Sequence, residues 1–340
     1  MSVSKILQPD VQLLSAVFRG SDDAAFHELL HLAQLVGVDL TRLSHADMRD
    51  GVLRFTSENC PPGHVNATFH ELFAPYFSAA ATLLDVHQDS AKILELLVAV
   101  GTTIRGKVVG VVGAHGGAGA STLAATLARE LVSRGGGVAL IDIDPASAGI
   151  ELLLSLVGVT GKRWADVHGQ GALLAGKLNS ALPLWHGVRV LSADERGGMP
   201  PNAEAGPNII AAISQMNAWT VIDIPTSALV PEMPTNSVLE WCDYLFVVTR
   251  CDAVHLATTH TLLSRMNTAL LTSVVAINVT SKNEAAHIAQ MLAVDFVHTV
   301  RFEHSYESAL EHGVEPGERS RSRFSRDVHT LCAYLEQVVP

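Results

Sequence analysis

From residue 107 onward the chain alternates short apolar runs with longer amphipathic segments. Six of the runs are rich in Val, Ile and Leu and are bounded by glycine or polar residues. Short, continuously apolar runs are typical of strands that are buried on both faces. We therefore predict an α/β fold, a mostly parallel sheet with helices on both faces. Its strands are expected at residues 108–113, 138–143, 188–191, 219–224, 244–249 and 273–278.

The first third of the chain has a different pattern. Apolar residues recur at helical spacing over 26–36 and again over 69–77, where Pro75 interrupts the run. A strand-like run at 81–86 leads into a helical segment at 90–100. These elements predict a small N-terminal domain of a separate character.

The segment from Gly101 to Gly106, with a glycine at each end, marks a domain boundary. We therefore divide the chain into an N-terminal domain, residues 1–105, and an α/β domain, residues 107–340. The N-terminal domain is expected to be an interaction module.

Composition and charge narrow the class of protein. Of the 340 residues 48% are apolar and 17% charged, and the net charge is −11. These values fit a globular core and argue against a globally basic surface for nucleic acid. The four cysteines form no CxxC pair, and no secretory leader or 18-residue apolar run is evident. We expect a cytoplasmic protein. The 16 histidines are scattered without metal-ligand spacing.

A glycine-rich turn joins the first strand of the α/β domain to an alanine-rich helix. Glycines permit a tight turn whose backbone N–H groups point inward, and the helix N-terminus attracts anions. A P-loop has the form G-x-x-x-x-G-K-[ST], but here Ala114 holds the first Gly position and Ala120 the Lys position. A tight helix start without a ligand is the alternative interpretation. The candidate nucleotide-binding residues are His115, Gly116, Gly117, Ala118, Gly119, Ala120, Ser121 and Thr122.

Acidic residues follow two other predicted strands. One strand ends in Asp142-Ile143-Asp144 and another ends in Asp223-Ile224-Pro225. Ligands of parallel sheets bind at the carboxyl ends of the strands, so these acids should lie beside the glycine loop. Mg²⁺ takes one or two carboxylates together with phosphate oxygens and water, and a hydroxyl after the loop usually completes its shell. The pattern predicts a site for Mg²⁺ with ATP or ADP.

The order of several motifs resembles the MinD/ParA family of deviant-Walker P-loop ATPases. The motifs are GGAGAST, LIDIDPASAGIELLLSL, WTVIDIPTS, CDYLFVVTRCDAVHLATTHTLL and VVAINV. More narrowly they resemble the CpaE/TadZ branch, which includes the actinobacterial septum-site-determining (Ssd) proteins. The resemblance covers about residues 107–330, and the N-terminal third matches only loosely. It implies a P-loop NTPase-like fold.

The resemblance also implies roles for single residues. Gly116 to Thr122 would wrap the phosphates, and Ser121 would ligand Mg²⁺. Asp142 and Asp223 would hold metal-bound waters, and Asp144 would position the attacking water. Asn278 would contact adenine, although Val279 stands where an Arg usually follows.

Two departures from the family concern charge. Ala120 replaces the loop lysine, as is typical of the branch, and His115 replaces the signature Lys that reaches the partner's phosphates in a dimer. A charge-assisted contact is worth about 1.5–3 kcal/mol in binding, and catalytic cations are worth about 10³–10⁵ in rate. We therefore expect weak nucleotide binding with very slow or no hydrolysis. A dimer that forms only with ATP would mean that His115 or a nearby arginine such as Arg250 or Arg301 supplies the missing charge.

The resemblance implies a regulator that positions the division septum or a Tad-type pilus or secretion machine. Its expected partners are a second copy of the chain and proteins of that machinery, with no specific nucleic acid, and recruitment to a pole or septum is possible. Two alternatives stay open. The chain could be a genuine slow ATPase switch of the ParA/MinD type, or a scaffold that binds no nucleotide.

The two ends of the chain carry weaker signals. ATLLDVHQDSAKILELL resembles the last strand and helix of a receiver domain, but Asp85 stands where a Lys belongs and no clear acidic pair precedes it. An unrelated appendage is the alternative. At the other end, an apolar helical pattern from Val328 to Val338 follows four arginines between 319 and 326. We expect this helix to dock on the core, so membrane association would be peripheral at most.

Overall fold

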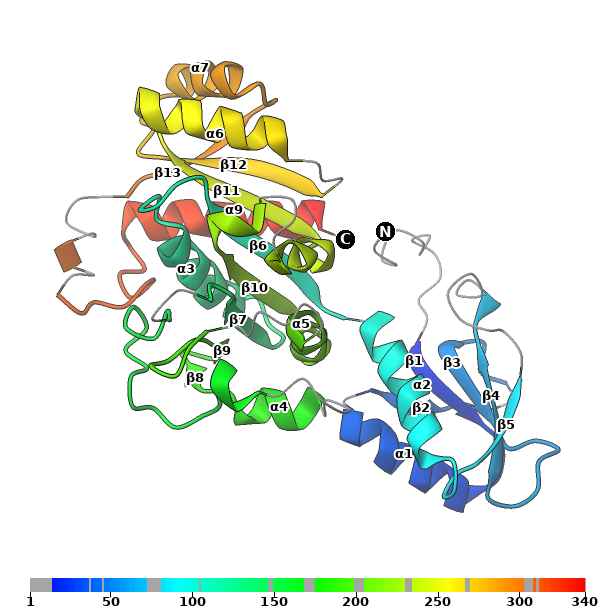
Figure 1. The fold of residues 1–340 in the computed structure, drawn as a ribbon. Helices are drawn as coiled ribbons and strands as arrows, with labels where there is room; N and C mark the ends of the chain where they lie inside the picture. Colours follow the sequence, from blue (N-terminus) through cyan, green and yellow to red (C-terminus); the bar gives the residue numbers. More distant parts are fainter. Residues whose placement is uncertain are drawn as a thin grey trace. The chain divides into compact units, whose positions relative to one another are not determined.

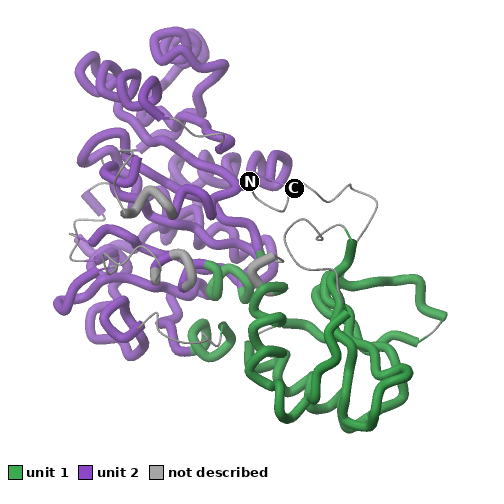
Figure 2. Tube along the Cα trace, turned by 45° about the vertical axis from the view of Figure 1, so that its right-hand side comes forward, with its two compact units in different colours: residues 1–105, 170–180, 211–216 green, residues 106–169, 181–210, 217–340 purple. Residues whose placement is uncertain are grey.

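The computed structural model describes residues 14–36, 38–44, 46–71, 81–103, 105–145, 149–167, 175–198, 205–229, 234–266, 270–302, 308–309 and 312–339. The chain divides into two compact units (Figure 2). Unit 1 comprises Met1–Arg105, Gln170–Ser180 and Ala211–Met216. Unit 2 comprises Gly106–Gly169, Ala181–Ile210 and Asn217–Pro340.

Unit 1 contains a five-stranded sheet of order β2-β1-β3-β4-β5 (Figure 1). Strands β1, β2 and β3 pair in parallel, whereas β4 pairs antiparallel with both β3 and β5. The elements of this sheet are β1 (Leu14–Arg19), β2 (Leu40–Arg42), β3 (Gly51–Thr56), β4 (His64–Phe69) and β5 (Thr82–Asp85). The helices α1 (Asp23–Val36) and α2 (Ser90–Thr103) pack with this sheet, and the unit also takes in residues 170–180 and 211–216.

The core of unit 1 forms between the two helices and one face of this sheet. Along β4, buried Val65, Ala67 and Phe69 alternate with half-buried polar residues, as expected for a strand with one buried face. Leu29 of α1 and Leu97 of α2 join the same apolar cluster. The unit is therefore a sheet whose packed face is covered by α1 and α2.

The predictions for this region were partly wrong. Helix α1 confirms the helix expected over 26–36, and α2 confirms the one expected over 90–100. The helix expected over 69–77 is not observed at its start, because Phe69 ends β4, and residues 72–80 lie outside the described residues. Asp22 and Asp23 lie three and four residues after the end of β1 and form an acidic pair that was not recognised in the sequence.

Unit 2 is built on an eight-stranded sheet of order β13-β12-β11-β6-β10-β7-β9-β8, as Figure 1 shows. Every neighbouring pair is parallel except β8 with β9. The strands are β6 (Lys107–Gly113), β7 (Val138–Asp142), β8 (Leu184–Trp185), β9 (Val188–Leu191), β10 (Trp219–Ile224), β11 (Tyr244–Arg250), β12 (Leu271–Ile277) and β13 (Val297–Val300). All six strands predicted for this region are present, within two residues at each end.

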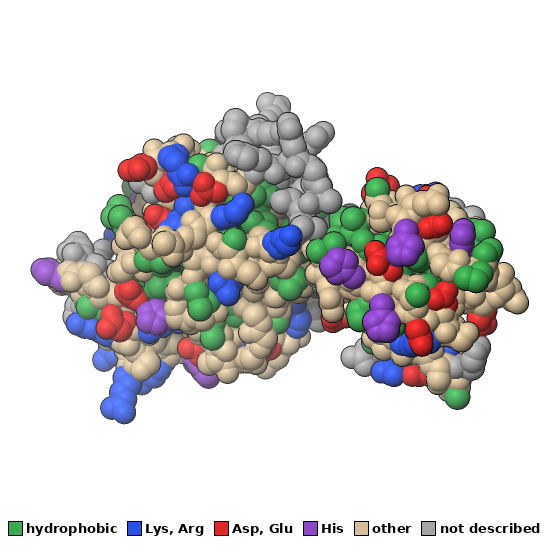
Figure 3. Space-filling model, turned by 90° about the horizontal axis from the view of Figure 1, so that it is seen from below, with side chains coloured by type: hydrophobic (Ala, Val, Ile, Leu, Met, Phe, Trp, Pro, Cys, Tyr) green, Lys and Arg blue, Asp and Glu red, His purple; other side chains and the backbone are tan. Residues whose placement is uncertain are grey.

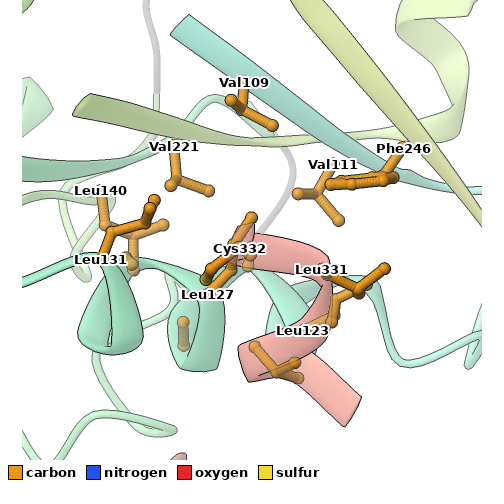
Figure 4. Close-up of a cluster of buried hydrophobic side chains, with 14 of the residues drawn as sticks. Val109, Val111, Leu123, Leu127, Leu131, Leu140, Val221, Phe246, Leu331 and Cys332 are labelled. Carbon is orange, nitrogen blue, oxygen red and sulfur yellow. The ribbon is translucent and has the colours of Figure 1, made fainter. Parts of the chain in front are cut away.

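Helices cover both faces of the large sheet. On one face, Leu123 and Leu127 of α3 (Ala120–Val132) and Leu331 of α9 (Arg323–Val338) pack against Val109 and Val111 of β6 (Figure 4). On the other face, α6 (Ala253–Arg265) and α7 (Lys282–Leu292) pack on β12 and β13. The described chain also contains α4 (Ala175–Ala181), α5 (Ala205–Gln215) and the 3₁₀ segments η3 (Trp164–Asp166), η4 (Thr226–Leu229) and η5 (Pro234–Trp241). The doubly wound α/β fold expected from the sequence is thus observed.

The last helix docks on the core, as predicted. Ser322 caps α9 by accepting a hydrogen bond from the Ser325 amide, and the apolar face of the helix is buried. That face comprises Phe324, Val328, Leu331, Cys332 and Leu335. Among the described residues, no helix is long and apolar enough to cross a membrane. On the face drawn in Figure 3, Lys and Arg side chains are interspersed with Asp and Glu.

Candidate nucleotide site

The site is built at the carboxyl end of β6, the strand between β10 and β11 in the sheet. The glycine-rich loop leaves β6 at Gly113 and enters α3 at Ala120. The Ala114 amide donates to the Val248 carbonyl at 2.9 Å, and the Thr226 hydroxyl donates to the Gly113 carbonyl at 2.7 Å. These bonds fix the start of the loop to β11 and to the segment after β10.

Two glycines give the loop its curvature. Gly117 has φ +73° and Gly119 has φ +93°, values of the left-handed region that residues with a side chain rarely adopt. A Cβ atom added at Gly116, Gly117 or Gly119 would contact no other described atom within 4 Å. The backbone of the loop therefore borders open space, which a phosphate chain could occupy.

The N-terminus of α3 opens onto the same loop. Gly119 is its N-cap residue, and no side chain caps the helix. The first N–H groups of an uncapped helix carry a partial positive charge and need acceptors. Phosphate oxygens are suitable acceptors for such groups. The arrangement has the geometry of an anion cradle, and the binding of phosphate there stays a prediction.

Asp223, at the end of β10, is the acidic residue in contact with this helix start. The Ser121 hydroxyl, in the first turn of α3, donates a hydrogen bond to the Asp223 carboxylate. Burial, and to a smaller extent the negative charges of Asp142 and Asp144, raises the pKa of Asp223 to about 7. A nearby cation would stabilise this carboxylate.

Asp142, at the end of β7, is held by backbone amides. Its two oxygens accept hydrogen bonds from the Asp144 amide at 3.0 Å and the Ile150 amide at 3.1 Å. Burial nevertheless raises the pKa of Asp142 to about 6. In the described part of the chain neither Asp142 nor Asp223 is paired with a basic side chain. The structure thus brings together Ser121, Asp142, Asp144 and Asp223.

The donor set fits Mg²⁺ only together with a ligand that brings its own oxygens. Among the described residues, no group of three or more His, Cys, Asp or Glu side chains is arranged to hold a metal ion. Mg²⁺ commonly takes one or two protein oxygens and completes its shell with phosphate oxygens and water. Ser121 and Asp223 are placed to provide those protein oxygens.

His115, in the loop that follows β6, contacts the end of strand β11 and the backbone of the loop itself. The Arg250 amide donates to His115 Nε2 at 3.2 Å, so Nε2 is the acceptor and Nδ1 carries the hydrogen. Nδ1 then donates to the Gly116 carbonyl at 3.0 Å. The Arg250 side chain adds a second contact, since its Nε donates to the Gly117 carbonyl at 3.1 Å.

The His115 ring also stacks on the first turn of α6. The ring centroids of His115 and His255 lie 3.7 Å apart, with 24° between the ring planes. Asp252 caps α6 by accepting from the His255 amide at 3.2 Å, and it also pairs with the His255 ring. The His255 hydrogen bond lowers the pKa of Asp252. His115 is therefore held on both sides within its own chain.

Asn278 lies after β12, at the same edge of the sheet. Its backbone has φ +64°, its amide donates to the Val300 carbonyl at 2.8 Å, and its Oδ1 accepts from the Phe302 amide at 2.6 Å. The side chain thus links the ends of β12 and β13, and the expected adenine contact remains a prediction. Arg301 binds Asp327 of α9 through its amide and guanidinium.

The sequence did not predict the donors that bind Asp142, nor the contact of His255, which pairs with Asp252, with the His115 ring. The Ile150 amide belongs to the segment after β7, and the Trp164 indole in the same segment donates to the Asp142 carbonyl at 2.6 Å. Main-chain donors leave no residue-type signal. His255 and Asp252 could have been suspected, because the predicted strand 244–249 places them just beyond the sheet edge that carries the loop.

Comparison with known protein families gives a partial match. Residues 79–151 match the model of the methylmalonyl Co-A mutase-associated GTPase MeaB. Two uncharacterized proteins of Mycobacterium tuberculosis, Rv3660c and MT3760, are each 33% identical to this chain over 223 residues. The match covers 62% of this chain and 59% of each relative, so it spans less than two thirds of their length.

Solved structures resemble the chain more broadly. A ParA family ATPase from Chlorobium tepidum aligns with a TM-score of 0.58 and 18% identity, covering 68% of this chain and 99% of that one. The cell division ATPase MinD of Pyrococcus furiosus gives 0.54 and 19%, with 68% and 99% covered. MinD of Pyrococcus horikoshii, solved with Mg-ADP, gives 0.50 and 16%, with 68% and 96% covered. The chain has the fold of the MinD/ParA-type P-loop ATPases.

Proposed function

We propose that the chain is a MinD/ParA-like nucleotide-binding regulator that binds ATP or ADP with Mg²⁺ and hydrolyses ATP slowly or not at all. One arrangement carries the proposal: the open glycine loop, the uncapped start of α3 and the Ser121–Asp223 pair meet at the carboxyl end of β6. The likeness to MinD solved with Mg-ADP supports the choice of ligand.

Each part of the site has a defined task in this proposal. Backbone N–H groups from Gly116 to Thr122 bind the phosphates, and Ser121 with Asp223 holds Mg²⁺, which would neutralise phosphate charge. Asp142 supports metal-bound water, and Asp144 orients a water molecule. Asn278 has its Nδ2 available as a hydrogen-bond donor for the adenine base, because Oδ1 binds the Phe302 amide.

The charge of the site supports slow turnover. Phosphoryl transfer depends on positioning and on positive charge around the transferred group. Ala120 offers a methyl group where the loop lysine would stand, and the His115 imidazole is bound to the backbone on both of its nitrogens. Three carboxylates gather beside the loop. Binding through backbone donors and Mg²⁺ is compatible with this field, whereas rapid hydrolysis is not.

We further propose that the chain belongs to the CpaE/TadZ branch, near the Ssd proteins, and positions a division septum or a Tad-type secretion machine. The resemblance of MinD, a cell division ATPase, supports this role. Residues 1–105 would act as the interaction domain of a homodimer, with residues 107–340 as the nucleotide domain. Partners co-purified from the native cell would identify the machine and its site at a pole or septum.

Two measurements on purified protein test the biochemical proposal. Fluorescent ATP titrated with and without Mg²⁺ should bind in a Mg²⁺-dependent manner, and phosphate release at saturating ATP should stay near background. Asp144→Ala should remove any slow release that remains above background, whereas the surface control Asp295→Ala should leave it unchanged. A readily measured rate that Asp144→Ala abolishes would instead identify a true ATPase switch. Absence of any nucleotide binding would leave only the interaction scaffold.

A further inference from the structure

We infer that Arg250 is the phosphate-binding cation of this site and takes over the binding task, though not the catalytic task, of the lysine that Ala120 replaces. This inference rests on the proposed nucleotide function and deepens it. Arg250 is the last residue of β11, the strand directly beside β6, and its side chain is exposed. It is therefore a fixed cation that a ligand entering from solvent can reach.

The main chain and the side chain of Arg250 are both directed to the loop. Its amide donates to His115 Nε2, and its Nε donates to the Gly117 carbonyl at 3.1 Å. A guanidinium is a rigid planar group that stays charged, with five N–H donors in a fixed fork. Holding Nε at Gly117 consequently holds the whole positive charge at the loop, beside the open space that borders Gly116, Gly117 and Gly119.

The acidic residues beside the loop explain why a phosphate ligand would need the positive charge of Arg250. Asp142, Asp144 and Asp223 lie at or just after the ends of β7 and β10, beside the loop, so their negative charges would repel a polyphosphate. The positions that carry lysine in related loops hold Ala120 and His115. Mg²⁺ would offset part of the repulsion, and Arg250 would offset more of it from the opposite side of the loop.

The stacked histidines act in this account as positioning residues for Arg250. Asp252 holds the His255 ring, that ring stacks on His115, and His115 accepts the Arg250 amide. The chain of contacts fixes the end of β11 against the start of the loop. If Arg250 only held the loop in place, its Nε contact with the Gly117 carbonyl would be sufficient. The role of its charge can therefore be tested separately from that contact.

Fluorescent ATP binding in the presence of Mg²⁺ tests the inference. Arg250→Gln removes the charge and should raise the Kd roughly tenfold or more, the effect of one charge-assisted contact. Arg250→Lys keeps the charge and should recover part of the loss. Arg265→Gln, an exposed residue in the last turn of α6, is the matched control and should bind as the wild type does. The thermal unfolding midpoint without nucleotide should be alike in all four proteins.

The double variant with Ala120→Lys gives the sharpest result. If Arg250 replaces the loop lysine, the restored lysine should reduce the cost of Arg250→Gln several-fold, a coupling that independent sites do not show. The inference is overturned if Arg250→Gln binds ATP within twofold of the wild type, if Arg250→Lys is as impaired as Arg250→Gln, or if the two substitutions are additive. A wild-type protein that binds no nucleotide would refute the proposed function itself and the inference with it.

Discussion

Each of the two sheets has an acidic residue at or just beyond the carboxyl end of a strand. The surroundings of these two residues shift their pKa values in opposite directions. In unit 1, Asp22 follows β1 and accepts hydrogen bonds from the amides of Ala25 at 3.0 Å and Gly63 at 2.9 Å. These bonds lower its pKa. In unit 2, Asp223 is buried at the end of β10, and burial raises its pKa to about 7.

The difference in pKa shift separates an acid with a structural role from a buried acid without a basic partner. Asp22 uses its charge to cap α1, and its neighbour Asp23 pairs with Arg42 at 2.6 Å. Asp223 has the Ser121 hydroxyl as a donor but two carboxylates as neighbours. Position at a strand end therefore does not by itself indicate a ligand site, whereas a buried carboxyl without a basic partner beside an open loop favours one.

The largest expected effect is on stability in the absence of Mg²⁺. A carboxyl whose pKa rises from 3.8 to about 7 on folding stabilises the protein when protonated, below pH 3.8, and this stability is lost as pH rises through about 7. Asp223→Asn should therefore raise the free energy of unfolding at pH 8 by as much as about 4 kcal/mol. Urea denaturation at pH 5 and pH 8 measures the change. A variant less stable than the wild type at pH 8 would contradict the assignment.

The next largest effect is expected on nucleotide affinity, when a positive charge is returned to the loop. Ala120→Lys returns a point charge to the phosphate side and should tighten nucleotide binding roughly ten- to a hundredfold, or about 1.5–3 kcal/mol. Equilibrium titration with fluorescent ATP measures it, and Lys282→Ala on exposed α7 serves as an unrelated charge change. If Ala120→Lys bound ATP with the same affinity as the wild type, the phosphates would not lie beside residue 120.

A smaller effect of opposite sign is expected in unit 1. Asp22→Ala removes the cap of α1 and should lower the free energy of unfolding at pH 7 by about 1 kcal/mol. Because the pKa of Asp22 is lowered on folding, its contribution is present above its ordinary pKa and is lost as pH falls below that value. Nucleotide affinity should not change. A loss of affinity would show that Asp22 takes part in the ligand site.

The smallest expected change is in assembly. His115 stands at the position of the cross-dimer lysine, but both of its ring nitrogens are hydrogen-bonded to backbone groups, so dimerisation should depend little on ATP. Sedimentation of the wild type should give a dimer with and without nucleotide. A protein that stays monomeric with and without ATP would contradict the proposal of a homodimeric regulator. A dimer that forms only with ATP would favour the alternative of an ATPase switch.

The sequence predicted unit 2 far better than unit 1, for physical reasons. Buried parallel strands such as 219–224 are continuous apolar runs, so their positions can be seen locally. In unit 1, β4 alternates apolar and polar residues over only six positions, and its final Phe69 was assigned to a helix. Without β1 in the prediction, Asp22 and Asp23 could not be placed at a strand end.

The site shows the same limit. Gly117, Ser121 and Asp223 follow from motif and strand position, because their chemistry is in the side chain or in its absence. The donors to Asp142 are main-chain amides, one of them eight residues further on at Ile150, and no pattern of residue types reports them. The adenine contact expected of Asn278 stays a prediction, and the bond that its Oδ1 accepts from the Phe302 amide depends on how β12 and β13 end, which the sequence does not indicate.

The central claim is that the carboxyl edge of unit 2 is a Mg²⁺–nucleotide site that depends on Asp223. Titration calorimetry of ATP into the wild type and Asp223→Asn, each with Mg²⁺ and with a chelator, tests it most directly. We predict tighter binding with Mg²⁺ in the wild type and no Mg²⁺ effect in Asp223→Asn. Equal Mg²⁺-dependent affinity in the two proteins would contradict the account.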